Sequence, residues 1–194
     1  MSLWKNWKDF YELTKDKPPR RLIVQAMPHV QQKESALDLG AGALNDSIYL
    51  LGEGFAHVTA EDAEPLATEI ADKLPADKFT YVVEKMESFT FRAKEYDLVN
   101  AQYTLPFLHP DQFEKVWSEI IRSLKTGGIF TGQFFGDRDE WQGKDTMTFH
   151  TRAEAEKLLE KLTVLEFEEE EVDKPTAAGI MKHWHVFHFI ARVK

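Results

Sequence analysis

The 194-residue sequence contains no cysteine. Disulfide frameworks, thiolate metal sites and cysteine nucleophiles are therefore excluded. Long apolar runs are also missing, because no stretch approaches the roughly 18 apolar residues that a membrane span needs. The opening residues Met1–Trp7 lack the apolar core of a secretory signal, so we expect a cytoplasmic protein.

Positive charge is scarce, with 24 Lys and Arg against 33 Asp and Glu and a net charge of −9. A nucleic-acid surface needs clustered Lys and Arg, so we expect neither nucleic acid nor an anionic membrane as a partner. The hydrophobic fraction of 43% and the charged fraction of 29% are ordinary for a folded domain. The length fits one domain with a substantial core.

The most informative pattern is a short apolar strand that runs into a glycine-rich turn at residues 36–42, Ala-Leu-Asp-Leu-Gly-Ala-Gly. Glycine lets the backbone approach a ligand, and Asn45 can begin a helix with free N–H groups. The next apolar stretch ends in Glu61 and Asp62, about 20 residues beyond the glycines, where nucleotide sites bind ribose hydroxyls. The pattern predicts a nucleotide-type ligand, bound through Asp62 or, with a shifted strand end, Glu61.

Apolar and helical patterns alternate along the rest of the chain. The strands are expected at 36–39, 56–61, 79–83, 96–101, 129–135, 163–171 and 184–193, and the clearest helices at 111–124 and 151–161. Alternation predicts an α/β fold of the Rossmann-like kind, a seven-stranded, mostly parallel sheet with helices on both faces and an antiparallel last strand. The helical spacing of residues 3–14 and the prolines before Arg20 add an N-terminal helical cap. We expect one domain over 1–194, with the cap at 1–30 and the sheet at 31–194.

Several motifs in this order resemble those of the class I S-adenosylmethionine-dependent methyltransferases. They are the glycine loop with Asp38, the acid Asp62, the strand 96–101, the turn 124–130 (Leu-Lys-Thr-Gly-Gly-Ile-Phe) and the ending 182–192. Together with Phe10-Tyr11 and Pro18-Pro19-Arg20, they are most similar to the tellurite-resistance-type small-molecule methyltransferases. Two departures are Leu44, where the family loop has its last glycine, and Thr126 in place of proline.

This resemblance implies S-adenosylmethionine as the cofactor and a small molecule as the methyl acceptor. Asp38 would orient the loop and accept from the methionyl amino group, and Asp62 would accept from the ribose. Met86 and Glu87 follow the third strand, where the family holds adenine. The residues expected to contact the cofactor are Asp38, Gly40, Ala41, Gly42, Asn45, Asp62, Met86, Glu87, Gln102, Tyr11 and Arg20.

No catalytic residue is evident, and the chemistry explains why. Methyl transfer from a sulfonium needs mainly alignment and exclusion of water, and a base only if the acceptor must lose a proton. Candidates for substrate contact or proton removal are His183 and His185, which share one face of the last strand, and Tyr103 after the fourth. The two histidines lack further ligands at metal-site spacing, so we expect no metal. A monomer or homodimer fits equally well.

Two other classes stay open. An NAD-dependent oxidoreductase would share the strand–glycine–helix pattern, but Asp38 and Asn45 disfavour it. A non-catalytic protein that binds S-adenosylmethionine on the same fold is favoured by Leu44 alone. DNA amino-methylating enzymes are excluded, because they need prolines where this chain has Ala101 and Gln102.

Overall fold

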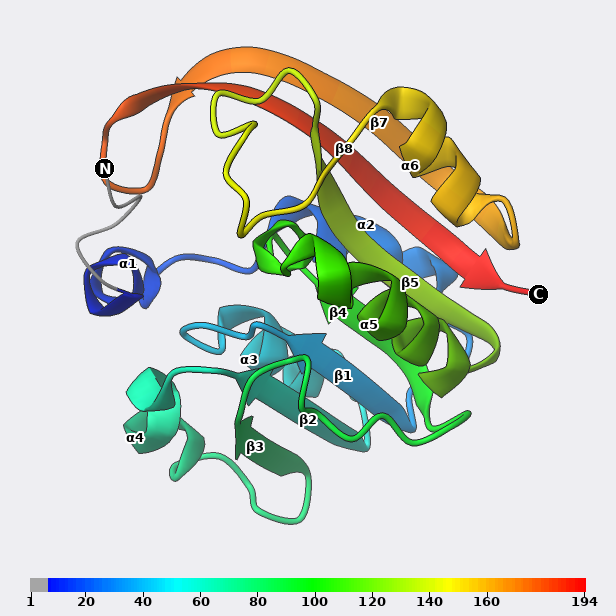
Figure 1. Ribbon diagram of the computed structural model, residues 1–194. Helices are drawn as coiled ribbons and strands as arrows, with labels where there is room; N and C mark the ends of the chain where they lie inside the picture. The colour runs from blue at the N-terminus through cyan, green and yellow to red at the C-terminus, as the bar shows by residue number, and fades with distance from the viewer. Residues whose placement is uncertain (1–6) are drawn as a thin grey trace.

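The computed structural model describes residues 7–194, which fold around a sheet with the strand order β3-β2-β1-β4-β5-β8-β7 (Figure 1). The strands are β1 Ser35–Leu39, β2 His57–Asp62, β3 Phe79–Val83, β4 Tyr96–Ala101, β5 Leu124–Gly136, β6 Phe149–His150, β7 Leu162–Pro175 and β8 Met181–Val193. Strands β1 to β5 pair in parallel, and β8 is antiparallel to both β5 and β7. The predicted fold class is confirmed. The sequence did not predict β6, a two-residue strand paired with β5.

The helices are α1 Trp7–Thr14, α2 Arg21–Ala26, α3 Asn45–Gly52, α4 Thr68–Ala71, α5 Pro110–Ser123 and α6 Arg152–Leu159, with 3-10 turns at Met27–His29, Pro65–Ala67 and Leu105–Phe107. Helix α5 begins with Pro110, whose missing N–H costs nothing there. Helix α6 begins with the expected capping box of Thr151 and Glu154. Of the helix expected over 3–14, residues 3–6 lie outside the described residues.

Helices cover both faces of the sheet, because its strands alternate apolar side chains between the two sides. Within β1, Leu37 joins the cluster that includes Trp117 of α5 and Leu159 of α6, whereas Ala36 joins the cluster that includes Ile23 of α2 and Leu50 of α3. In Figure 1, α5 and α6 lie in front of the sheet and α2 and α3 behind it. The arrangement buries the central strands and leaves their carboxyl ends for a ligand.

Strand β5 is longer than expected. It begins at Leu124, before the glycine turn, and a register shift against β4 occurs between Tyr96 and Leu98. Gly127 takes φ +81°, and a Cβ at Gly128 would lie 2.9 Å from the Lys125 carbonyl oxygen. The glycines therefore let the strand bend without ending it.

The N-terminal segment lies on the side of the carboxyl ends of the strands, with α1 at the left of Figure 1. Two hydrogen bonds fix it to the start of α3. The Asn45 side-chain amide donates to the Thr14 carbonyl oxygen (2.8 Å), and the Arg20 N–H donates to the Asp46 carboxylate (2.8 Å). The segment after α1 is therefore held directly above the glycine loop.

Candidate functional site

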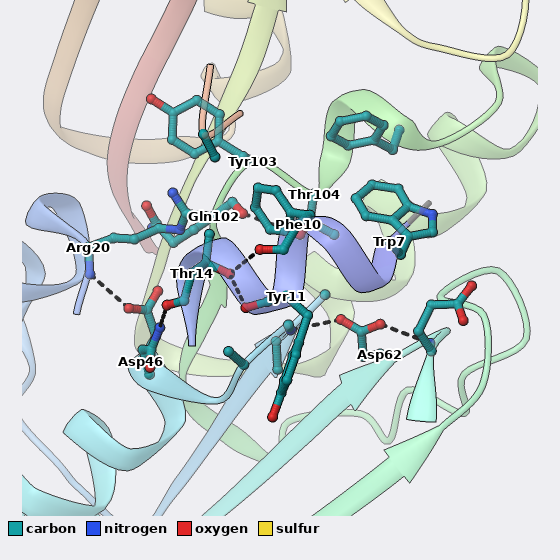
Figure 2. Close-up of a pocket in the computed structure, with 18 of the residues that line it drawn as sticks. Trp7, Phe10, Tyr11, Thr14, Arg20, Asp46, Asp62, Gln102, Tyr103 and Thr104 are labelled. Atoms are coloured by element: carbon teal, nitrogen blue, oxygen red, sulfur yellow. Dashed lines mark hydrogen bonds between the residues drawn. The ribbon is translucent and has the colours of Figure 1, made fainter. Parts of the chain in front are cut away.

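A cavity of about 780 Å³ opens at the carboxyl ends of β1, β2 and β4, beneath α1. All the residues that the sequence predicted as cofactor contacts line it: Tyr11, Arg20, Asp38, Gly40, Ala41, Gly42, Asn45, Asp62, Met86, Glu87 and Gln102. Tyr103 lines it as well, whereas His183 and His185 do not. Figure 2 shows α1 crossing the cavity, with Asp62 and Tyr103 on different sides of it.

The glycine loop is held in the left-handed region of backbone space. Gly40 has φ +61°, and a Cβ there would lie 2.2 Å from Thr104 Oγ1, so no side chain fits. Leu44, in place of the family glycine, also takes a left-handed φ of +63°, with its side chain fully buried. The conformation costs roughly 1–2 kcal/mol, and burial of the leucine contributes about as much or more. The loop thus keeps the glycine-type backbone despite the substitution.

The two acids at the end of β2 have different surroundings. Asp62 accepts from the N–H groups of Gly42 (2.7 Å) and Glu64 (2.9 Å), one on each carboxylate oxygen. Glu61 accepts from the Gly40 N–H (3.2 Å) and is only 1% exposed. Burial raises the pKa of Glu61 to about 8, so this carboxyl is mostly neutral near pH 7. Burial raises the pKa of Asp62 too, but its carboxylate is less enclosed and keeps free lone pairs toward the cavity.

A second pair of acids lies beneath the loop. Asp38 accepts from the Ser47 hydroxyl (2.6 Å) and the Asn100 amide (2.8 Å), and the same amide also donates to Asp46 (3.1 Å). Burial and, after it, the charge of Asp46 raise the pKa of Asp38 to about 7. Two carboxyl groups that share one amide favour a cation beside them, such as the ammonium of an amino acid.

A chain of buried amides leads from this pair to Tyr103. The Gln102 amide donates to Asn100 (2.8 Å), and the Gln133 amide donates to Gln102 (2.8 Å). The Gln133 carbonyl oxygen accepts from the Tyr103 N–H (2.7 Å). Tyr103 has a left-handed φ of +56°, which costs about 1–3 kcal/mol unless its surroundings enforce it. Gln133 therefore fixes where the Tyr103 side chain points. In the sequence, the only sign of this role is that Gln133 is a polar residue within an apolar strand.

The Tyr103 ring lines the cavity, 5.1 Å from the Arg20 guanidinium carbon. Burial raises the pKa of Tyr103, so its hydroxyl stays protonated near pH 7. The side chain can donate a hydrogen bond there, but it does not provide a base.

The predicted catalytic histidines lie away from the cavity. His183 contacts Asp173 (2.8 Å) and Glu171 (3.2 Å), and these acids raise its pKa. His185 is buried; its Nε2 contacts Glu169 (2.9 Å), and its Nδ1 accepts from the Arg138 N–H. Side chains alternate along a strand, so Trp184, between the two histidines, faces the cavity instead. The sequence identified the strand beside the cavity but the wrong face of it.

The sequence also missed the aromatic lining. Besides Tyr11 and Tyr103, six further aromatic residues reach the cavity: Trp7, Phe10, Phe107, Phe135, Trp141 and Trp184. Within residues 7–194, no group of three or more His, Asp or Glu side chains is arranged to hold a metal ion. No helix in that range is long and apolar enough to cross a membrane.

Comparison with known proteins identifies relatives of this site. A family model described as a methyltransferase domain matches residues 36–128, which contain the glycine loop, β2, the loop after β3 and β4. The chain is 36% identical over 97 residues to the uncharacterized methyltransferase sll0829 of Synechocystis sp.. That match covers 50% of this chain, and it spans only 45% of the relative's length.

Solved structures share the fold. TehB from Haemophilus influenzae superposes with a TM-score of 0.73 at 18% identity, over 89% of this chain and 61% of that one. The 1,6-didemethyltoxoflavin-N1-methyltransferase of Burkholderia thailandensis also gives 0.73, at 22% identity, over 97% of this chain and 84% of that one. The Burkholderia enzyme was solved with 1,6-didemethyltoxoflavin and S-adenosylhomocysteine bound. At these identities the similarity establishes the fold.

Proposed function

We propose that this chain is a class I S-adenosylmethionine-dependent methyltransferase whose cavity aligns S-adenosylmethionine with a small organic molecule that takes the methyl group. One observation supports this most strongly. The glycine loop, the end of β2, the loop after β3 and the segment after β4 contribute residues to a single cavity at the carboxyl ends of the parallel strands, where α/β folds bind their ligands.

The residues present fit the cofactor. In this proposal the free lone pairs of Asp62 accept from the two ribose hydroxyls, and Met86 with Glu87 receives the adenine. Asp38 and Asp46 provide negative charge for the methionyl ammonium, and Arg20 provides a guanidinium for its carboxylate. Arg20 lines the cavity with its guanidinium over the Tyr103 ring, so this cation can meet a ligand there.

The cofactor supplies an electrophilic methyl group on a sulfonium, whose sulfur leaves as a neutral thioether. The protein's part is then to hold the acceptor in line and to exclude water. Helix α1 lies over the cavity and is tied to the loop through Thr14 and Asn45, which suits the second task. No histidine of residues 7–194 lines the cavity, and the Tyr103 hydroxyl is protonated. Neither of these groups therefore serves as a base, and an acceptor that attacks through an already unprotonated atom needs none.

Binding distinguishes the proposal from an oxidoreductase. We expect S-adenosylhomocysteine to raise the melting temperature of the protein, since a ligand that binds only the folded state stabilises it, whereas NAD and NADP should not. A shift with NAD and none with S-adenosylhomocysteine would overturn the proposal.

Turnover distinguishes it from a non-catalytic binding protein. The protein is incubated with S-adenosylmethionine labelled in the methyl group and with a panel of thiols, metalloid oxyanions, amines and aromatic compounds. Label should appear in at least one acceptor. Retention of all label in the cofactor, despite tight S-adenosylhomocysteine binding, would support the regulatory alternative instead.

A further inference from the structure

The cavity beyond Tyr103 is bounded by aromatic rings, which we call the aromatic wall: Tyr103, Phe107, Phe135, Trp141 and Trp184. The rings form a continuous network of edge-to-face and tilted contacts. Tyr103 lies 6.2 Å from Trp184, Trp184 5.5 Å from Trp141, and Phe107 6.4 Å from Trp141. Trp7 of α1 extends the network, with its ring 5.4 Å from Phe107. These rings come from α1, the segment after β4, β5, the loop that follows it, and β8.

The two indoles of this wall already hold cations of the protein itself. The Lys182 ammonium lies 3.8 Å from the Trp184 ring centre and 4.3 Å from that of Trp141. It is paired with Asp139 at 2.5 Å, and both side chains are buried. Lys144 lies 4.8 Å from Trp141 on the same wall. Two lysine ammonium groups therefore already lie beside these indoles, and their positive charge disfavours a further cation against the same rings.

The wall also fits poorly with small hydrated acceptors. An oxyanion or a short alkyl thiol would leave most of the ring surface wet, whereas a flat ring can make offset or edge contacts with several rings together. Arg20, near Tyr103, places positive charge at the entrance to this region. A flat shape, apolar area and the absence of positive charge are therefore the properties that this surface selects.

We propose that the methyl acceptor is a planar aromatic molecule, neutral or anionic, that lies against the aromatic wall and is methylated on an unprotonated ring or substituent atom. This inference rests on the proposed methyl transfer and specifies its substrate class. A lone pair of the acceptor forms the bond to the methyl carbon as the carbon–sulfur bond breaks, with its electron pair staying on sulfur. An anionic acceptor and the sulfonium give two neutral products, and a neutral acceptor takes over the positive charge as the thioether leaves, so no further reactant is needed.

The test uses ligands that differ in one property. Phenylmethanethiol and cyclohexylmethanethiol share size and the reacting group, but only the first is aromatic, and benzylamine keeps the ring while carrying positive charge. Their affinities are measured by calorimetry on the full chain saturated with S-adenosylhomocysteine. Methyl transfer to the two thiols is then followed with labelled S-adenosylmethionine. Phenylmethanethiol should bind about tenfold more tightly than cyclohexylmethanethiol, and benzylamine should bind more weakly than phenylmethanethiol.

Matched variants locate the preference. Phe107→Leu removes one ring of the wall while keeping an apolar side chain, and it should reduce the aromatic preference to a few-fold. The control variant is Phe167→Leu. It removes a ring of β7 that stacks on Phe187 of β8 and lies outside the cavity lining, so it should leave the preference unchanged.

Each outcome bears on a separate claim. Equal or reversed affinity for the two thiols, tightest binding of benzylamine, or binding of neither thiol would overturn the aromatic acceptor. In those cases methyl transfer itself would still stand if S-adenosylhomocysteine binds. Failure of S-adenosylhomocysteine to bind in the same calorimeter would instead refute the proposed function.

Discussion

The sharpest prediction separates the two neighbouring acids at the end of β2. Asp62→Ala removes a carboxylate whose free lone pairs face the cavity, whereas Glu61→Gln changes a carboxyl that is already mostly neutral near pH 7. The glutamine can still accept from the Gly40 N–H, so its loop support is retained. Asp62→Ala should weaken S-adenosylhomocysteine binding strongly, and Glu61→Gln should leave it nearly unchanged.

The magnitude follows from the bonds lost. A hydrogen bond to a charged group is worth about 1.5–3 kcal/mol, which corresponds to a roughly 10- to 150-fold rise in Kd. Asp62→Ala also frees the N–H groups of Gly42 and Glu64, so its effect should lie toward the upper end. Asp62→Asn retains one acceptor oxygen and should fall between the alanine variant and the unchanged protein.

Titration calorimetry with S-adenosylhomocysteine near pH 7 measures all these affinities. The melting temperature of each unliganded variant serves as the control, because a misfolded loop would lower it. Unchanged affinity in Asp62→Ala together with a large loss in Glu61→Gln would refute the reasoning and make Glu61 the ribose acid.

Three further outcomes are expected. Because burial raises the folded-state pKa of Asp38 from 3.8 to about 7, the unliganded fold retains a proton that the unfolded chain loses. The contribution of Asp38 to the stability of the unliganded protein should therefore fall as pH rises from about 4 to 7. The affinity for S-adenosylhomocysteine, measured by calorimetry, should rise through about pH 7. The opposite trends would contradict this assignment. Asp139→Asn leaves the buried Lys182 ammonium without its carboxylate partner and should lower the free energy of unfolding by about 3–5 kcal/mol in urea denaturation. An unchanged midpoint would contradict a stabilising ion pair between these two residues. Gly40→Ala forces a Cβ against Thr104 and should cost on the order of 1–3 kcal/mol, visible as a lower melting temperature.

The parts of the fold that depend on local pattern could be predicted. The run 36–42 specifies a buried strand and a tight turn by its own residues, and the capping box of Thr151 specifies where α6 begins. Asp62, the last residue of β2, lies at the cavity as the sequence predicted, because parallel strands bring their carboxyl ends to one edge.

The rest depends on contacts between distant segments. Which face of β8 meets the cavity is set by its pairing with β5, where Phe134 lies opposite Phe187, and a shift by one residue would have turned His185 inward. The support of Tyr103 by Gln133 joins residues 30 positions apart and has no local pattern. The left-handed backbone at Leu44 could not be expected either, because leucine disfavours it and only burial from several elements enforces it.

The position of β8 has a consequence for how the protein folds during its synthesis. The last strand along the chain lies inside the sheet, between β5 and β7. A ribosome releases strands in chain order, so β5 emerges with its β8-facing edge unpaired and Phe130 without its partner ring Phe189. Until residues 181–193 have been translated, the nascent chain exposes an open, apolar strand edge, which is a surface that chaperones bind and that other chains can pair with. A chain that stops before residue 181 would therefore leave β5 and β7 without the strand that lies between them.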